Sequence, residues 1–166
     1  MEIRKEMSCN GFRFGDKIQK PETMEKKLFE QEFKGYWRER DSKGLPAYSG
    51  IFVVQSFYHD RDLGKVSMND LIYIGKADNI NERVRIHEKW YVWKKELKPG
   101  EQLCFSCTPV PKEDRERVAA ALIRANQPKM NSVYKNTFPF GTTVVNLYGD
   151  YPLLKKKIVV ENPEDE

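Results

Sequence analysis

The chain has 166 residues, of which 39% are hydrophobic and 33% are charged, a composition typical of a single soluble globular domain. It contains no apolar run of the roughly 20 residues that a membrane-spanning helix needs, its first residues lack the apolar core of a secretory signal, and its three cysteines are too few for a disulfide framework. The net charge is only +4, but the last six residues hold four acids and no base, so residues 1–160 carry +8, a balance that suits a polyanionic partner.

The first half of the chain predicts one helix followed by two strands. Apolar residues recur at helical spacing over residues 21–40, which begin with a proline that suits a first helical turn. Residues 50–57 and 70–75 are short runs rich in β-branched and aromatic side chains, which are typical of strands. The polar segment between these runs is long for a hairpin loop, so we expect a surface excursion there.

The second half predicts two helices around a third strand. An apolar helical stripe over residues 79–97 begins with a capping-box pattern. Residues 102–110 alternate like a strand, residues 112–126 carry a second helical stripe, and residues 142–148 form a last strand or an extended cover. This order indicates an α/β domain with a small, mostly antiparallel sheet.

The densest cluster of polar side chains surrounds the second strand and the helix after it. Arg83 and His87 are four residues apart, so they project from the same face of the predicted helix. Tyr73 and Lys76 lie at the strand end that leads into this helix, so all four side chains can converge. Two cations, a phenol and an imidazole around one point suit phosphodiester cleavage, since the cations neutralise the transition state and the other two groups handle protons. The alternative is a solvated basic helix face with Tyr73 in the core.

Two tripeptides in this region, Gly50-Ile51-Phe52 and Tyr73-Ile74-Gly75, resemble the signature of the GIY-YIG nuclease superfamily. In that family a lysine, an arginine and a histidine or tyrosine follow the second tyrosine at fixed offsets. These offsets fall on Lys76, Arg83 and His87.

The resemblance extends over about residues 48–131, because a helix ending in a Pro-x-x-Asn pattern closes the family's motif and Asn131 occupies its last position. It implies a three-stranded antiparallel sheet flanked by helices, with Gly50, Phe52, Gly75 and Asn131 as structural motif residues. We therefore expect a nuclease core over residues 46–135, an N-terminal helical extension over residues 1–45, and an extended C-terminal segment over residues 136–166 that ends in the acidic tail.

The resemblance also implies hydrolysis of DNA with one Mg²⁺ or Mn²⁺ ion per active site and no organic cofactor. The metal glutamate is expected at the position of Ala119, and the nearest acid on that helix face is Glu116, one turn earlier. Three interpretations stay open: Glu116 is a displaced ligand, Ala119 is an engineered inactivating substitution, or the chain is a relic that only binds nucleic acid. Phe52 is a second departure, because it lacks the hydroxyl that the family's first tyrosine carries, and we expect it in the core.

The main hypothesis from the sequence is a compact DNA endonuclease in which Tyr73, Lys76, Arg83 and His87 are catalytic. We also expect Arg124 and Lys129 to contact the DNA backbone together with Lys76 and Arg83. One site per chain would require a homodimer or two successive visits to cut both strands. Size and family analogy favour a cytoplasmic bacterial or phage enzyme of the restriction or defence type. The alternative is a module on the same fold that binds nucleic acid without cleaving it.

Overall fold

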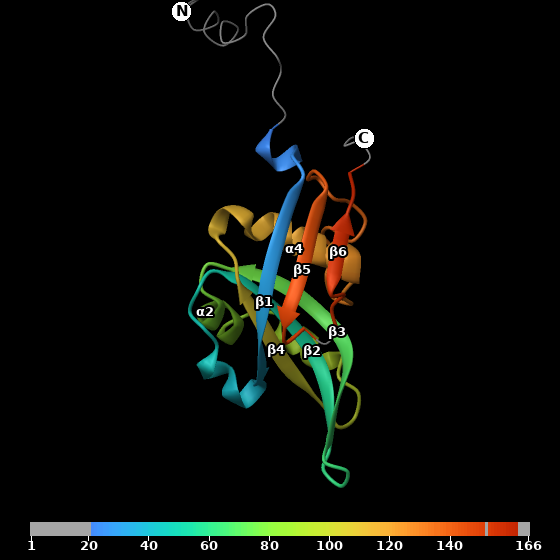
Figure 1. Cartoon of the computed structure of the whole chain (residues 1–166). Coiled ribbons are helices and arrows are strands. Elements are labelled where there is room, and N and C mark those ends of the chain that lie inside the picture. The colour runs from blue at the N-terminus through green and yellow to red at the C-terminus, as the bar shows by residue number, and fades with distance from the viewer. Residues whose placement is uncertain (1–20, 152, 163–166) are drawn as a thin grey trace, which may run out of the picture.

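The computed structural model describes residues 21–151 and 153–162, which fold into one curved, six-stranded mixed sheet with few helices (Figure 1). The strand order is β3-β2-β4-β1-β5-β6, and every neighbouring pair is antiparallel except β1 and β5. The strands are β1 (Lys27–Arg38), β2 (Gly50–Asp60), β3 (Lys65–Ala77), β4 (Glu101–Pro109), β5 (Thr143–Gly149) and β6 (Lys157–Val160).

This architecture corrects the expected fold class, which was a small three-stranded antiparallel sheet flanked by helices. The sheet has twice that number of strands, contains a parallel pair, and curls into a half-barrel. Strands β1 and β6 come from segments that were expected to be a helical extension and an extended tail, whereas β5 confirms the strand alternative for residues 142–148. Residues 1–20 and 163–166, which include most of the acidic tail, lie outside the described part of the chain.

The predicted N-terminal helix is wrong because residues 27–38 form β1. Phe29 and Phe33 are both buried, and their spacing of four residues fits a strand period of two as well as a helical turn. The burial of two neighbouring residues distinguishes the strand from the helix. Gln31, midway between the two phenylalanines, is buried with them, whereas Leu28, which a helical stripe would bury, is 58% exposed. Backbone pairing of β1 with both β4 and β5 stabilises the extended conformation.

The expected surface excursion is instead a long β-hairpin. Strands β2 and β3 continue to Asp60 and Lys65, so only four residues form the turn. Asp60 accepts hydrogen bonds from the backbone N–H groups of Asp62 and Leu63, and Gly64 has the positive φ that the turn requires. The hairpin projects from the body of the molecule (Figure 1).

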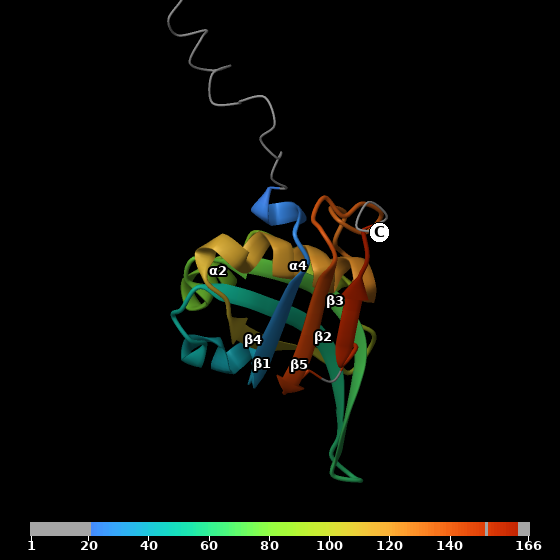
Figure 2. The same ribbon diagram turned by 45° about the horizontal axis from the view of Figure 1, so that its top comes forward.

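The helices cover both faces of the curved sheet. Helix α4 (Lys112–Asn126) lies across one face, as Figure 2 shows, and packs its buried residues against β1, β2, β3, β5 and β6. The predicted helix over residues 79–97 is two short helices, α2 (Ile80–Arg85) and α3 (Trp90–Lys95), on the opposite face. Two 3₁₀ helices, Glu22–Met24 and Glu39–Gly44, flank β1. None of the helices in the described ranges combines the length and apolar character that crossing a bilayer requires.

Candidate functional site

A cleft of about 330 Å³ lies at the edge of the sheet, where β3 has a strand neighbour on one side only. The break between α2 and α3 borders it from one face of the sheet, α4 borders it from the other, and residues 131–134 run beside β3. Its lining includes three predicted structural motif residues, Phe52, Gly75 and Asn131. It also includes the residues predicted for catalysis and metal binding and two polar residues that the sequence did not indicate: Tyr73, Lys76, Arg83, His87, Glu116 and Ala119, with Lys89 and Tyr134.

Asn131 fixes the strand that carries Tyr73 and Lys76. Its side-chain amide accepts a hydrogen bond from the backbone N–H of Ile74 and donates one to the carbonyl oxygen of the same residue, both at 2.9 Å. Asn131 therefore takes the place of a neighbouring strand at this edge of β3. This pairing gives the asparagine a structural role, which its side-chain amide fulfils because it offers a donor and an acceptor together.

The glycine of the second tripeptide makes room for the phenylalanine of the first. A Cβ on Gly75 would lie 2.2 Å from the ring of Phe52, so no larger residue fits without moving that ring. Phe52 is fully buried and its ring packs near Tyr73, His87 and Trp93. The phenylalanine thus forms the floor of the cleft and holds the aromatic residues above it.

Arg83 is exposed at the cleft and is bound by Glu88, a carboxylate that the sequence did not indicate. Its guanidinium donates two hydrogen bonds to Glu88, at 2.9 and 3.2 Å, and this contact lowers the pKa of Glu88 to about 2. The pair is at the surface, where the Arg83 side chain is 41% exposed and Glu88 65%. An anion entering the cleft can therefore take the place of Glu88 on Arg83.

His87 is neutral in this environment. Its side chain is almost fully buried in the break between α2 and α3, and Nδ1 accepts a hydrogen bond from the backbone N–H of Lys89 at 3.0 Å. Burial, followed by the nearby Arg83 charge, lowers the pKa of His87 to about 4. Because Nδ1 is an acceptor, the ring proton is on Nε2, so the imidazole offers a hydrogen-bond donor and no positive charge.

The Tyr73 hydroxyl is protonated. Burial raises its pKa, and the positive charge of Arg83 opposes this shift only in part. The Lys89 ammonium lies over the Tyr73 ring, 4.9 Å from its centroid. Tyr134 across the cleft also has a raised pKa, caused by burial and then by the charge of Glu116. Both phenols are therefore hydrogen-bond donors.

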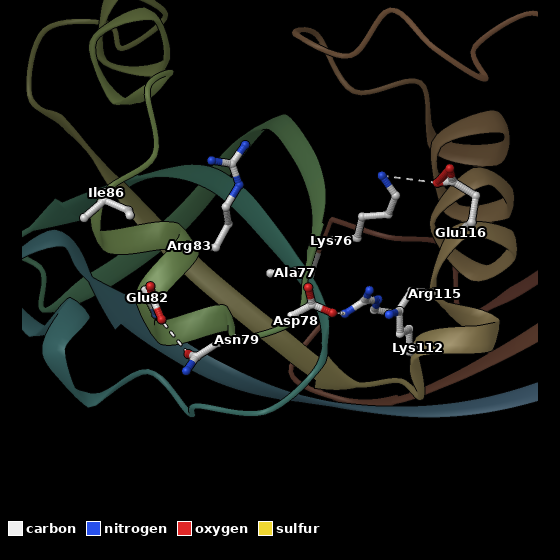
Figure 3. A pocket seen from close by; sticks show the side chains of 10 residues that line it. All are labelled: Lys76, Ala77, Asp78, Asn79, Glu82, Arg83, Ile86, Lys112, Arg115 and Glu116. Atoms are coloured by element: carbon white, nitrogen blue, oxygen red, sulfur yellow. Dashed lines mark hydrogen bonds and ion pairs between the residues drawn. The ribbon is translucent and has the colours of Figure 1, made fainter.

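Glu116 and Ala119 both line the cleft from α4, as the helical spacing predicts. The carboxylate of Glu116 forms an ion pair with Lys76 at 3.2 Å, and both side chains are about half exposed. Ala119 is 3% exposed and presents only a methyl group. Figure 3 shows Lys76 and Glu116 reaching toward each other from β3 and α4.

A second, larger hollow of about 700 Å³ continues from the cleft and shares Lys76, Arg83 and Glu116 with it (Figure 3). On its far side Arg115 donates to Asp78 at 2.6 Å and to the Ser49 hydroxyl at 3.1 Å. The cleft and this hollow form one groove whose middle is the Lys76–Glu116 pair.

Two predicted DNA contacts lie outside the groove. Lys129 forms an ion pair with Asp70 at 3.1 Å, and Arg124 donates to the carbonyl oxygen of Lys135 at 2.9 Å. Asp70 is a carboxylate whose pKa is lowered chiefly by Lys129, so this lysine already has an anionic partner.

Glu116 is the carboxylate that lines the cleft, and Asp78 and Glu82 also line the larger hollow. The described residues contain no group of three or more His, Cys, Asp or Glu side chains that could hold a metal ion. Mg²⁺ keeps several water ligands and is bound through one or two carboxylates together with substrate phosphates, so Glu116 fits a site that a phosphodiester completes. Cys104 and Cys107 are buried free thiols with raised pKa values, and neither lines the groove.

Comparison of the chain with protein-family models, curated proteins and solved structures found no match.

Proposed function

We propose that the chain is a DNA endonuclease of the GIY-YIG type that binds a phosphodiester in the cleft. The observation that carries this proposal is the meeting of Lys76, Arg83, Tyr73 and His87 around one hollow at the edge of β3. These residues come from a strand, a helix and a helix break. Two cations and two neutral donors on one concave surface form the donor set that a phosphate needs.

The environment of each group suggests its role. Arg83 and Lys76 neutralise charge on the attacked phosphate once it replaces Glu88 and Glu116 as their partner. Tyr73 positions the phosphate or the attacking water through its hydroxyl proton, because its raised pKa disfavours a phenolate base. His87 orients a phosphate oxygen through Nε2–H.

Glu116 is the carboxylate that would hold a divalent cation such as Mg²⁺ or Mn²⁺, whose chemistry is to polarise the phosphate and stabilise the leaving oxygen. Release from Lys76 would free the Glu116 carboxylate from its ion pair at a half-exposed position in the groove. One such site per chain serves one strand at a time, so a homodimer or two visits would cut a duplex.

A second candidate function is a module that binds nucleic acid without cleaving it. The methyl group of Ala119 at the position expected for the metal glutamate favours this function, because Glu116, which is paired with Lys76, is then the one carboxylate among the described residues that line the cleft. The phosphate-binding cations are the same in both candidates, so DNA binding alone does not separate them.

A plasmid-nicking assay with Mg²⁺ or Mn²⁺ separates the candidates. It compares the chain with Arg83→Ala, Glu116→Ala and Ala119→Glu, and DNA binding is measured in parallel with EDTA. The endonuclease proposal expects metal-dependent nicking that falls about 10²- to 10³-fold in Arg83→Ala and is lost in Glu116→Ala.

Other outcomes assign the protein differently. Nicking that survives Glu116→Ala contradicts the metal assignment. Nicking that appears only in Ala119→Glu indicates a cleft whose metal ligand has been removed. Binding without nicking by any of the four proteins supports the binding module, and absence of both binding and nicking rejects both candidates.

A further inference from the structure

A third hollow, of about 590 Å³, lies between the C-terminal end of α4 and β6, the last strand of the sheet. We call it the β6 hollow. Its lining includes the cations Arg124, Lys155 and Lys157 and one carboxylate, Glu161. Its floor is apolar and includes Ile158, which is buried against α4.

Local hydrogen bonds fix the backbone that carries these cations. Arg124 donates to the carbonyl oxygen of Lys135, and the backbone N–H of Lys155 donates to the side chain of Asn126 at the end of α4. Lys157 is an exposed residue on β6, which pairs with β5. Within residues 21–151 and 153–162 no ion pair neutralises Arg124, Lys155 or Lys157, in contrast to Lys129 beside Asp70.

The β6 hollow and the cleft border the same two segments of the chain. Ile123 lines the cleft and Arg124, the next residue, lines the β6 hollow. On the segment that runs beside α4, Tyr134 lines the cleft and Asn136, two residues later, lines the β6 hollow. Eight residues of α4 separate Glu116 from Arg124, about 12 Å along the helix axis.

We propose that the β6 hollow binds the DNA backbone next to the phosphate held in the cleft. Twelve ångströms correspond to about three to four base pairs of duplex, so a duplex along α4 reaches both surfaces. Among the described residues, three cations that no ion pair neutralises share this lining with one carboxylate, which favours a polyphosphate over a polypeptide partner. This inference rests on the proposed function, because it takes the ligand of the cleft to be DNA.

The test is the salt dependence of binding to a duplex of about 20 base pairs in EDTA. The variant Lys155→Gln/Lys157→Gln is compared with Lys43→Gln/Lys65→Gln, which removes the same charge from exposed lysines on η2 (Glu39–Gly44) and at the start of β3. Each phosphate contact contributes about 0.9 to the slope of log affinity against log salt. We expect the first variant to lower this slope by about 1.8 and the control to leave it unchanged. The ratio of the DNA affinity of the unmodified chain to that of the first variant should then fall about tenfold between roughly 50 and 200 mM salt.

The same titration keeps the two proposals apart when Arg83→Ala is included. Equal slopes for the two double variants, with weakened binding by Arg83→Ala, overturn the β6 hollow and leave the cleft as the DNA site. Weakened binding only in the Lys155→Gln/Lys157→Gln variant supports the β6 surface and counts against the cleft. Equal slopes together with binding of a poly-glutamate peptide that depends on Lys155 and Lys157 would assign the surface to an acidic polypeptide and overturn the proposal.

Discussion

Arg117 and Arg83 are arginines in two regions of this molecule that differ in what surrounds them. Arg117 on α4 is 5% exposed and lies where the start of β5 meets the segment before β1. Its guanidinium donates to the Thr143 hydroxyl at 2.8 Å and to backbone carbonyl oxygens, those of Glu22, Glu25, Gly141 and Thr142. Arg83 at the cleft is bound only by the exposed carboxylate of Glu88 among the described residues.

The difference shows how burial separates a structural cation from one that is available to a ligand. The Arg117 guanidinium is buried, and its hydrogen bonds to four backbone carbonyl oxygens and to Thr143 join the segment before β1 to the start of β5. Glu88 loses little when it leaves Arg83, because water solvates its carboxylate. A phosphate can therefore compete for Arg83, whereas Arg117 holds together segments that are distant in the sequence.

The largest effect that tests this comparison is expected from Arg117→Met. The variant removes the hydrogen bonds of a buried guanidinium to four carbonyl oxygens and a hydroxyl, and three of these carbonyl oxygens keep a second donor, so we expect the free energy of unfolding to fall by about 3 kcal/mol. Denaturant unfolding of the variant and the unmodified chain measures this change. The matched control is Arg83→Met, which should change stability by less than about 1 kcal/mol. Equal effects of the two substitutions would contradict the distinction between the regions.

The sequence predicted the elements whose period is unambiguous. Helix α4 begins and ends at the predicted residues 112 and 126, and β4, the first part of β2 and the second half of β3 occupy the predicted runs. The period over residues 27–38 was ambiguous, because Phe29 and Phe33 fit both a helix and a strand. The parallel neighbour that decides in favour of β1 is β5, more than 100 residues later, and no local pattern encodes that pairing.

The part of the candidate site whose residues lie close together in the sequence could be predicted. Lys76, Arg83 and His87 follow Tyr73 closely in the sequence, and all four line the cleft even though the helix between them breaks. Glu88, which holds Arg83, follows it by five residues, a spacing that does not bring side chains together on a continuous helix, so this pair depends on the break between α2 and α3. Contacts such as Tyr134 with Glu116, or those of Arg117 with Gly141, depend on how the chain returns to α4, so no local pattern indicates them.

The next largest change in stability is expected from His87, whose buried imidazole lines the cleft. Its folded-state pKa of about 4 lies below the ordinary value of 6.5, so the imidazole is neutral in both states above pH 6.5. As the pH falls toward 4, the unfolded chain binds a proton that the folded chain excludes, and stability falls. We expect a loss of about 2 kcal/mol between pH 6.5 and 4 from this residue.

Urea unfolding at several pH values checks this expectation. His87→Gln should flatten the decline in stability between pH 6.5 and 4, because the variant has no imidazole to protonate. The chain contains one other histidine, His59, on the projecting hairpin, and His59→Gln is the control that should keep the decline. A decline unchanged in His87→Gln would show that other groups cause it.

The smallest effect is expected from the Lys76–Glu116 pair, and it decides how available the groove is to a ligand. Both side chains are about half exposed at 3.2 Å, so water solvates their charges and the pair should contribute less than about 1 kcal/mol to stability. A double-mutant cycle with Lys76→Met and Glu116→Gln measures this coupling energy, and added salt should reduce it further. The corresponding cycle for Arg117→Met and Thr143→Val should give a larger, salt-insensitive value, because that contact is buried. A Lys76–Glu116 coupling as large as that of Arg117 would contradict the proposed exchange, since a phosphate could not then draw Lys76 away and leave Glu116 free to hold a cation.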